Sequence, residues 1–107
     1  MPGVFPHPDL TPLQVEALTI TAEEASEVAQ ECSKMLRMGP DFCRRGRDVS
    51  TKRHFSLEIV DLMLLVGICD KLGLLDDTLD AETAWNDKIE RLAQWSNLAD
   101  VARGVAS

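Results

Sequence analysis

The pattern of apolar and polar residues predicts a chain that begins with a long helix. No residue from Pro12 to about Met38 breaks a helix, although the length leaves room for a kink or short break near Thr19–Thr21. Thr11 can cap this helix, and a proline suits the first helical position because its missing N–H costs nothing there. Gly39-Pro40 ends the segment.

The rest of the chain predicts two further helices. Residues 56–72 are the most apolar stretch, which Ser56 can cap and which closes at Gly73. A turn at 74–80 leads to a third helix at about 81–102. Strand-like alternation and internal repeats are both absent from the sequence. The expected fold is therefore all-α, a bundle of three to four helices completed by oligomerisation, because a small chain buries little of so apolar a helix alone.

The length and the prolines set the expected domain organisation. A chain of 107 residues has room for one domain. Residues 1–10 contain three prolines and predict an extended N-terminal tail. Residues 11–107 are expected to form a single all-α domain, interrupted by a basic loop at 39–54.

Two short acidic clusters occupy positions where apolar residues are expected. Glu24 and Glu27 lie three residues apart in the first helix, and Glu58 and Asp61 have the same spacing in the second. Residues three or four apart share one face of a helix. The first pair falls on a stripe with apolar members, and the second pair is surrounded by apolar residues on all sides, which is typical of a buried helix. If the two helices pack antiparallel, four carboxylates converge.

A divalent cation would explain these acids. Removing an ionised carboxylate from water costs several kcal/mol, and several unpaired carboxylates together would take up protons or repel each other. Mg²⁺ binds a few carboxylate oxygens and keeps waters and phosphate oxygens as its remaining ligands. The usual explanation of acids at helical spacing is a solvated face, which the apolar surroundings of Glu58 and Asp61 disfavour. Glu31 lies one turn beyond Glu27 and either joins the site or marks where this face opens to solvent; we favour the second interpretation.

Composition narrows the functional classes. A net charge of −7 disfavours a nucleic-acid-binding surface. Three cysteines without metal-ligand spacing indicate free thiols in a reducing compartment. No uncharged run is long enough to cross a bilayer, and the first residues lack a signal pattern, so we expect a cytoplasmic protein without a membrane partner.

The basic loop has two interpretations. Residues 41–53 carry five of the eleven lysines and arginines in an acidic chain. Beside a carboxylate–metal centre, such a loop suits a polyphosphate substrate, because arginine forms charge-assisted hydrogen bonds with phosphate. The alternative is a solvated loop with scattered charge.

The paired motif Glu-Glu-x-x-Glu and Glu-x-x-Asp resembles the signature of the all-α nucleoside triphosphate pyrophosphohydrolases. These are the MazG-like proteins, related to dimeric dUTPases and dCTP pyrophosphatases. Similarity extends to the segments 18–20, 33–39, 88–92 and 95–96, so that it covers roughly residues 12–100. The thirty residues between Glu27 and Glu58 are at or beyond the long end of the family's usual spacing, and the resemblance therefore does not extend to the function of the loop.

The resemblance implies Mg²⁺-dependent hydrolysis of a nucleoside triphosphate to the monophosphate and pyrophosphate, in nucleotide-pool cleansing or balance. Mn²⁺ is an alternative ion, and a homo-oligomer, dimer or tetramer, is expected. The implied roles are metal ligands at Glu24, Glu27, Glu58 and Asp61, catalytic acids at Glu23, Glu24 and Glu27, and phosphate contacts at Lys34, Arg37, Lys88 and Arg91. Glu23 would be either a secondary acid beside the metal ligands or the residue that orients the attacking water.

The sequence argues against two other classes of metal-binding protein and leaves one alternative function. A di-iron bundle needs Glu-x-x-His pairs, and an EF-hand needs alternating Asp and Asn in a loop; the sequence has neither. A non-catalytic helical module that binds nucleotides or a protein, and retains the acidic metal site, remains an alternative.

Overall fold

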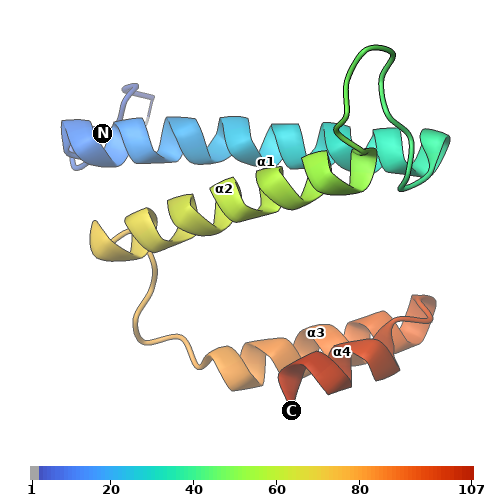
Figure 1. The fold of residues 1–107 in the computed structure, drawn as a ribbon. Helices are drawn as coiled ribbons and strands as arrows, with labels where there is room; N and C mark the ends of the chain where they lie inside the picture. Colours follow the sequence, from blue (N-terminus) through green and yellow to red (C-terminus); the bar gives the residue numbers. More distant parts are fainter. Residues whose placement is uncertain (1–2) are drawn as a thin grey trace. The chain divides into compact units, whose positions relative to one another are not determined.

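The computed structural model describes residues 3–107 and is built from helices (Figure 1). The four helices are α1 (Pro12–Met38), α2 (Thr51–Lys71), α3 (Ala81–Trp95) and α4 (Ala99–Ala106). Within the described residues the only strand-like pairing is a single antiparallel bridge between Cys43 and Ser50. The predicted all-α fold of three to four helices is confirmed.

The chain forms two compact units, which are described separately. The first ends at Leu75 and contains α1 and α2; the second spans Asp76–Ser107 and contains α3 and α4. We call them the α1–α2 unit and the α3–α4 unit. Residues 3–10, the described part of the predicted tail, contain no helix or strand.

Helix α1 begins and ends as the sequence predicts, and it runs without a break through Thr19–Thr21. Thr11 and Gln14 form a reciprocal capping box, in which each side chain accepts a hydrogen bond from the other residue's backbone N–H. At the other end the chain leaves the helix at Gly39, whose φ of 81° is readily adopted only by glycine.

Helix α2 begins five residues earlier than predicted. Its cap is Ser50, whose hydroxyl accepts a hydrogen bond from the backbone of Arg53. The expected cap, Ser56, lies inside the helix and donates its hydroxyl to the carbonyl of Lys52. Either serine could cap a helix. The hydrogen bond from the Thr51 hydroxyl to the carbonyl of Gly39, at the end of α1, favours the earlier one. The basic loop therefore spans residues 39–50.

The predicted third helix is divided into α3 and α4. The backbone is extended at Ser96, and the hydroxyl of Ser96 accepts a hydrogen bond from the backbone of Leu98. Serine and asparagine side chains compete with the helical hydrogen bonds of the backbone, which explains why Ser96-Asn97 interrupts the helix.

Helices α1 and α2 pack antiparallel along one seam (Figure 1). Gln14 Nε2 donates to the carbonyl of Leu72 at 2.9 Å at one end, and Thr51 donates its hydroxyl to the carbonyl of Gly39 at the other. Buried and half-buried residues recur at steps of three and four, as in a coiled coil. They include Gln14, Ala17, Thr21, Glu24, Val28, Glu31 and Met35 on α1, and Thr51, His54, Glu58, Leu62, Leu65, Cys69 and Leu72 on α2.

Helix α2 is not buried on all sides within the α1–α2 unit. Val60, Met63 and Leu64 point away from the seam and are 60%, 67% and 64% exposed. The α1–α2 unit by itself therefore does not bury this helix fully. No helix in the described residues has the length and apolar character needed to span a membrane.

Candidate metal centre

Three carboxylates meet on the α1–α2 seam. Glu24 and Glu27 come from successive turns of α1, and Glu58 comes from the facing part of α2. One carboxylate oxygen from each lies within 4.8 Å of the other two. Three oxygens at this separation can coordinate one cation from two helices, whereas the sequence predicts four ligands, Asp61 included.

Burial and the absence of counter-charges make this group unusual. Oxygens Glu24 Oε2 and Glu58 Oε2 are buried and have no hydrogen-bond partner in residues 3–107. None of the three carboxylates forms an ion pair with a described residue. A buried carboxylate oxygen without a partner loses its hydration and gains nothing in return. Such oxygens fit a hard cation such as Mg²⁺, which prefers carboxylate ligands.

The acids also affect one another electrostatically. The pKa of Glu27 is raised, first by a hydrogen bond shared with Glu58 and then by the negative charge of Glu58. Partial desolvation and the charge of Asp61 act in the same direction. Like charges raise a carboxyl pKa because the ionised form is repelled. A bound cation would reverse this effect, and protons and metal therefore compete for the group.

Two predicted site residues lie at the margin of this group. Asp61 is exposed and is not among the three converging carboxylates, although its charge reaches Glu27. Glu23 is exposed, next to Glu24 on α1, and also lies outside the converging set. Their predicted roles, as a fourth ligand and as a secondary acid, stay predictions.

The interpretation of Glu31 as the point where this face opens to solvent is wrong. It is 8% exposed and accepts an ion pair from Lys34 Nζ at 2.9 Å. The i,i+3 spacing on α1 lets Lys34 reach it, so that this buried acid has the counter-charge that Glu24 and Glu58 lack.

The predicted phosphate contacts fall in both units. In the α1–α2 unit, Lys34 is paired with Glu31, and Arg37 Nε donates to the carbonyl of Ser33 at 3.3 Å. In the α3–α4 unit, Lys88 Nζ lies 5.8 Å from the centre of the Trp95 ring, within the range of a cation–π contact. Arg91 donates to a backbone carbonyl on its own helix. Their predicted contacts with phosphate stay predictions.

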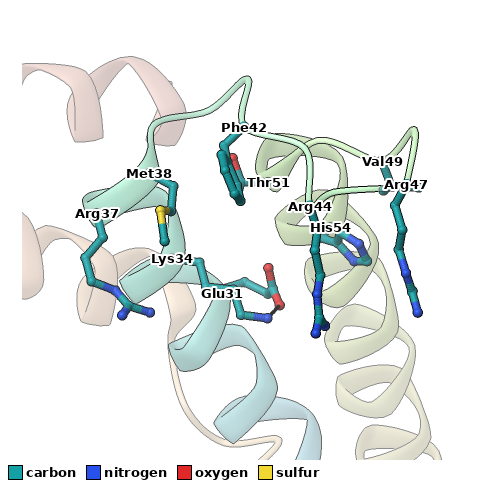
Figure 2. Close-up of a pocket in the computed structure, with 10 residues that line it drawn as sticks. All are labelled: Glu31, Lys34, Arg37, Met38, Phe42, Arg44, Arg47, Val49, Thr51 and His54. Carbon is teal, nitrogen blue, oxygen red and sulfur yellow. Dashed lines mark hydrogen bonds and ion pairs between the residues drawn. The ribbon is translucent and has the colours of Figure 1, made fainter.

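A cavity of about 490 Å³ lies between the end of α1, the basic loop and the start of α2 (Figure 2). Its basic residues include Lys34 and Arg37 from α1 and Arg44 and Arg47 from the loop. Glu31 lies at its edge on the seam side. The remaining lining residues are Met38, Phe42, Val49, Thr51 and His54.

Short backbone contacts close the loop that covers this cavity. The backbone N–H of Thr51 donates to the carbonyl of Phe42 at 2.8 Å, and that of Lys52 donates to Pro40 at 2.9 Å. Thr51 is only 6% exposed, and its hydroxyl bonds to Gly39. The two ends of the loop are therefore fixed to each other, and the loop is held over the seam.

The sequence did not identify which loop residues line the cavity. Arg44 and Arg47 were counted among five basic residues without distinction, and Phe42 and His54 were not assigned a role. The available signal was Gly46, which predicts a turn that brings residues 44 and 47 together. Comparisons with protein families, with curated proteins and with solved structures find no match for this chain.

Proposed function

We propose that this protein is a Mg²⁺-dependent nucleoside triphosphate pyrophosphohydrolase that acts on cytoplasmic nucleotides in the manner of MazG-like proteins. The observation that supports the proposal most directly is the convergence of Glu24, Glu27 and Glu58 without a counter-charge. The two buried oxygens without partners add to it, because they lack the neutralising contact that such oxygens need.

In this proposal the three converging acids hold the cation and Asp61 completes the set from the next turn of α2. Bound there, Mg²⁺ would polarise a phosphoryl oxygen and lower the pKa of a bound water. In the same proposal Glu23, which is exposed beside the acids, orients the attacking water. The oxygen of that water adds to a phosphorus of the α–β anhydride, and the P–O bond to the bridging oxygen breaks. The proton that the water loses passes to solvent, and monophosphate and pyrophosphate are released.

The decisive experiment is product analysis on a panel of ribo-, deoxyribo- and damaged nucleoside triphosphates, with Mg²⁺ and with excess chelator. We expect equal amounts of monophosphate and pyrophosphate, lost on chelation. Release of single phosphate would overturn the reaction class. No product from a folded protein that is shown to bind Mg²⁺ would favour the alternative, a non-catalytic module that retains the metal site.

We further propose that the chain functions as a homo-oligomer, a dimer or tetramer. The apolar side chains of Val60, Met63 and Leu64 are adjacent on α2 and more than half exposed. An apolar patch of this kind on a small protein marks an interaction surface. A second copy can cover it, because the same patch on each copy is complementary to itself around a two-fold axis.

The oligomeric state can be measured by sedimentation equilibrium. We expect at least twice the chain mass of 11.8 kDa, and dissociation to monomer in Met63→Glu/Leu64→Glu. Leu36→Glu, on an exposed apolar residue of α1, is the matched control and should leave the mass unchanged. A monomeric wild type at micromolar concentration would contradict this proposal.

A further inference from the structure

The cavity under the basic loop has an excess of positive charge. Of its four lysine and arginine residues, only Lys34 is paired with a carboxylate, at Glu31. Arg37, Arg44 and Arg47 form no ion pair with any residue in 3–107. Acids are abundant in a chain with a net charge of −7, and yet these three arginines of the cavity have no carboxylate partner among the described residues.

The turn in the loop selects two of these arginines. The backbone N–H of Arg47 donates to the carbonyl of Arg44 at 2.9 Å, which makes these residues the two ends of a tight turn. Gly46, with φ of 80°, supplies the left-handed conformation inside the turn. Figure 2 shows the side chains of Arg44 and Arg47 extending from the loop in the same direction, alongside α2. Arg45 lies at the tip of the turn and does not line the cavity.

The cavity and the three converging acids occupy neighbouring turns of the α1–α2 seam. Glu31 lies four residues after Glu27 on α1, and His54 lies four residues before Glu58 on α2. Four residues are about one helical turn, or about 6 Å of helix. A ligand of a few atoms in length can therefore reach from the arginines to the acids. A chain of phosphates has this length and the negative charge that the arginines need.

We propose that this cavity binds polyphosphate through Arg44 and Arg47, independently of any metal ion. Guanidinium groups bind phosphate oxygens through paired, charge-assisted hydrogen bonds, and two arginines that extend from one turn in the same direction suit a chain of phosphates. The proposed function is the basis for naming the ligand as the tail of a nucleoside triphosphate or as released pyrophosphate. Binding itself requires no turnover.

The test is isothermal titration calorimetry in excess EDTA at about 0.1 M salt, with ATP and with inorganic pyrophosphate as separate probes. We expect Arg44→Gln/Arg47→Gln to weaken binding about a hundredfold, or about tenfold per arginine. Arg45→Gln is the matched control, with the same charge change in the same turn. It should stay within about threefold, because salt screens a charge that makes no contact.

A charge-conserving variant separates contact from folding. Arg44→Lys/Arg47→Lys keeps both charges but loses the paired geometry, and its affinity should lie between those of wild type and the glutamine variant. Circular dichroism should show equal helicity in all variants. A wild type that binds only ATP identifies a substrate tail as the ligand, whereas one that binds both probes shows that pyrophosphate suffices.

Two results would overturn the inference: a wild type that binds neither probe, or an Arg44/Arg47 variant that binds as well as Arg45→Gln. The proposed hydrolase activity is tested separately by Glu27→Gln, which should retain polyphosphate binding in EDTA. Binding without turnover in the wild type would remove the hydrolase proposal and leave the cavity as a polyphosphate site.

Discussion

Two neighbouring regions of the α1–α2 seam carry opposite uncompensated charges. Around Glu24, Glu27 and Glu58, carboxylates meet without a basic side chain from the described residues to pair with them. About one turn further on, arginines of the basic loop line a cavity without a carboxylate partner. Both regions belong to the same unit, and yet they do not neutralise each other. Each is therefore suited to a ligand of opposite charge, a divalent cation in one case and a polyanion in the other.

At the boundary between these regions, a buried acid is neutralised by a lysine on the same helix. Lys34 reaches Glu31 across one turn of α1 and forms a 2.9 Å ion pair with this buried acid. A basic residue at the corresponding distance from Glu24 would be residue 27 or 28, where the sequence has Glu27 and Val28. The acidic region thus lacks a counter-charge because no basic residue follows Glu24 by three or four positions. The difference in charge between the two regions can be tested by mutation.

The largest expected effect is on turnover. Glu27→Gln removes one of the three converging charges and should reduce turnover at least about a hundredfold, because even indirect partners of a metal contribute ten- to a hundredfold. Asp61→Asn should reduce turnover by the same factor if Asp61 is a metal ligand. Steady-state release of pyrophosphate measures both, with circular dichroism to show intact helices.

Glu16→Gln is the control for this effect, since Glu16 is an exposed acid on the same helix outside the converging set. Its turnover should match that of the wild type. Full activity in Glu27→Gln would show that the metal ligands are misassigned. Full activity in Asp61→Asn alone would restrict the site to Glu24, Glu27 and Glu58.

The next effect is on thermal stability and needs no substrate. At a Mg²⁺ concentration ten times Kd, binding to the folded state adds about 1.4 kcal/mol, which raises Tm by about 5 °C or more in a chain of this size. In Glu58→Gln the shift should fall below about 1 °C. In EDTA the same variant should melt above the wild type, because one of the repelling charges is gone.

Differential scanning fluorimetry with and without Mg²⁺ measures both parts of this prediction. The Arg44→Gln/Arg47→Gln variant serves as the comparison, and its Mg²⁺ shift should equal that of the wild type. An equal Mg²⁺ shift in wild type and Glu58→Gln would place the ion elsewhere on the chain.

A smaller effect concerns pH. Because Glu58 and Asp61 raise the pKa of Glu27 above its ordinary value of 4.5, the folded chain holds this proton to higher pH than the unfolded chain does. The stabilisation is complete below about pH 4.5 and is lost as pH rises through the folded pKa. In EDTA, the free energy of unfolding of the wild type should therefore fall with rising pH in this range relative to that of Glu27→Gln.

Urea denaturation at a series of pH values measures that difference. Because Mg²⁺ competes with the proton, its affinity should weaken as pH falls through the same range. Parallel pH profiles of wild type and Glu27→Gln in EDTA would contradict the interaction between Glu27 and Glu58.

The sequence predicted the helices well where local signals are strong. The capping box at Thr11 and the glycine at 39 determine both ends of α1, and both act over a few residues. The start of α2 was predicted wrongly, at Ser56 instead of Ser50, because contacts of Thr51 with Gly39 and Phe42 favour the earlier cap. These contacts join the two ends of a loop, and no local pattern reveals them.

The acidic group was predictable for a different reason. Helical spacing places Glu24 and Glu27 on one face, and the apolar neighbours of Glu58 place it on the seam. Glu31 was misinterpreted because helical spacing alone does not show whether the facing helix still covers a position. The cavity could not be predicted, because it depends on how the loop folds back over α1 and α2.

The smallest expected effect tests whether the turn positions the arginines. Gly46 adopts φ of 80°, and an alanine there would be strained by about 1 kcal/mol or more, although nothing lies within 4 Å of the added carbon. The turn would then open or shift, and the side chains of Arg44 and Arg47 would no longer extend in the same direction. We expect Gly46→Ala to weaken polyphosphate binding by a few-fold while Mg²⁺-induced stabilisation stays unchanged.

Gly67→Ala is the matched control, because Gly67 lies inside α2 with equally free space and an ordinary helical backbone. Alanine there should stabilise the helix by about 0.5–1 kcal/mol and leave polyphosphate binding unchanged. Equal binding by the two variants would mean that the arginines act through charge near the cavity, and not through the geometry of the turn. Since a cation site needs no such turn, a loss of Mg²⁺ binding in Gly46→Ala would show that the acidic and basic regions are one coupled site.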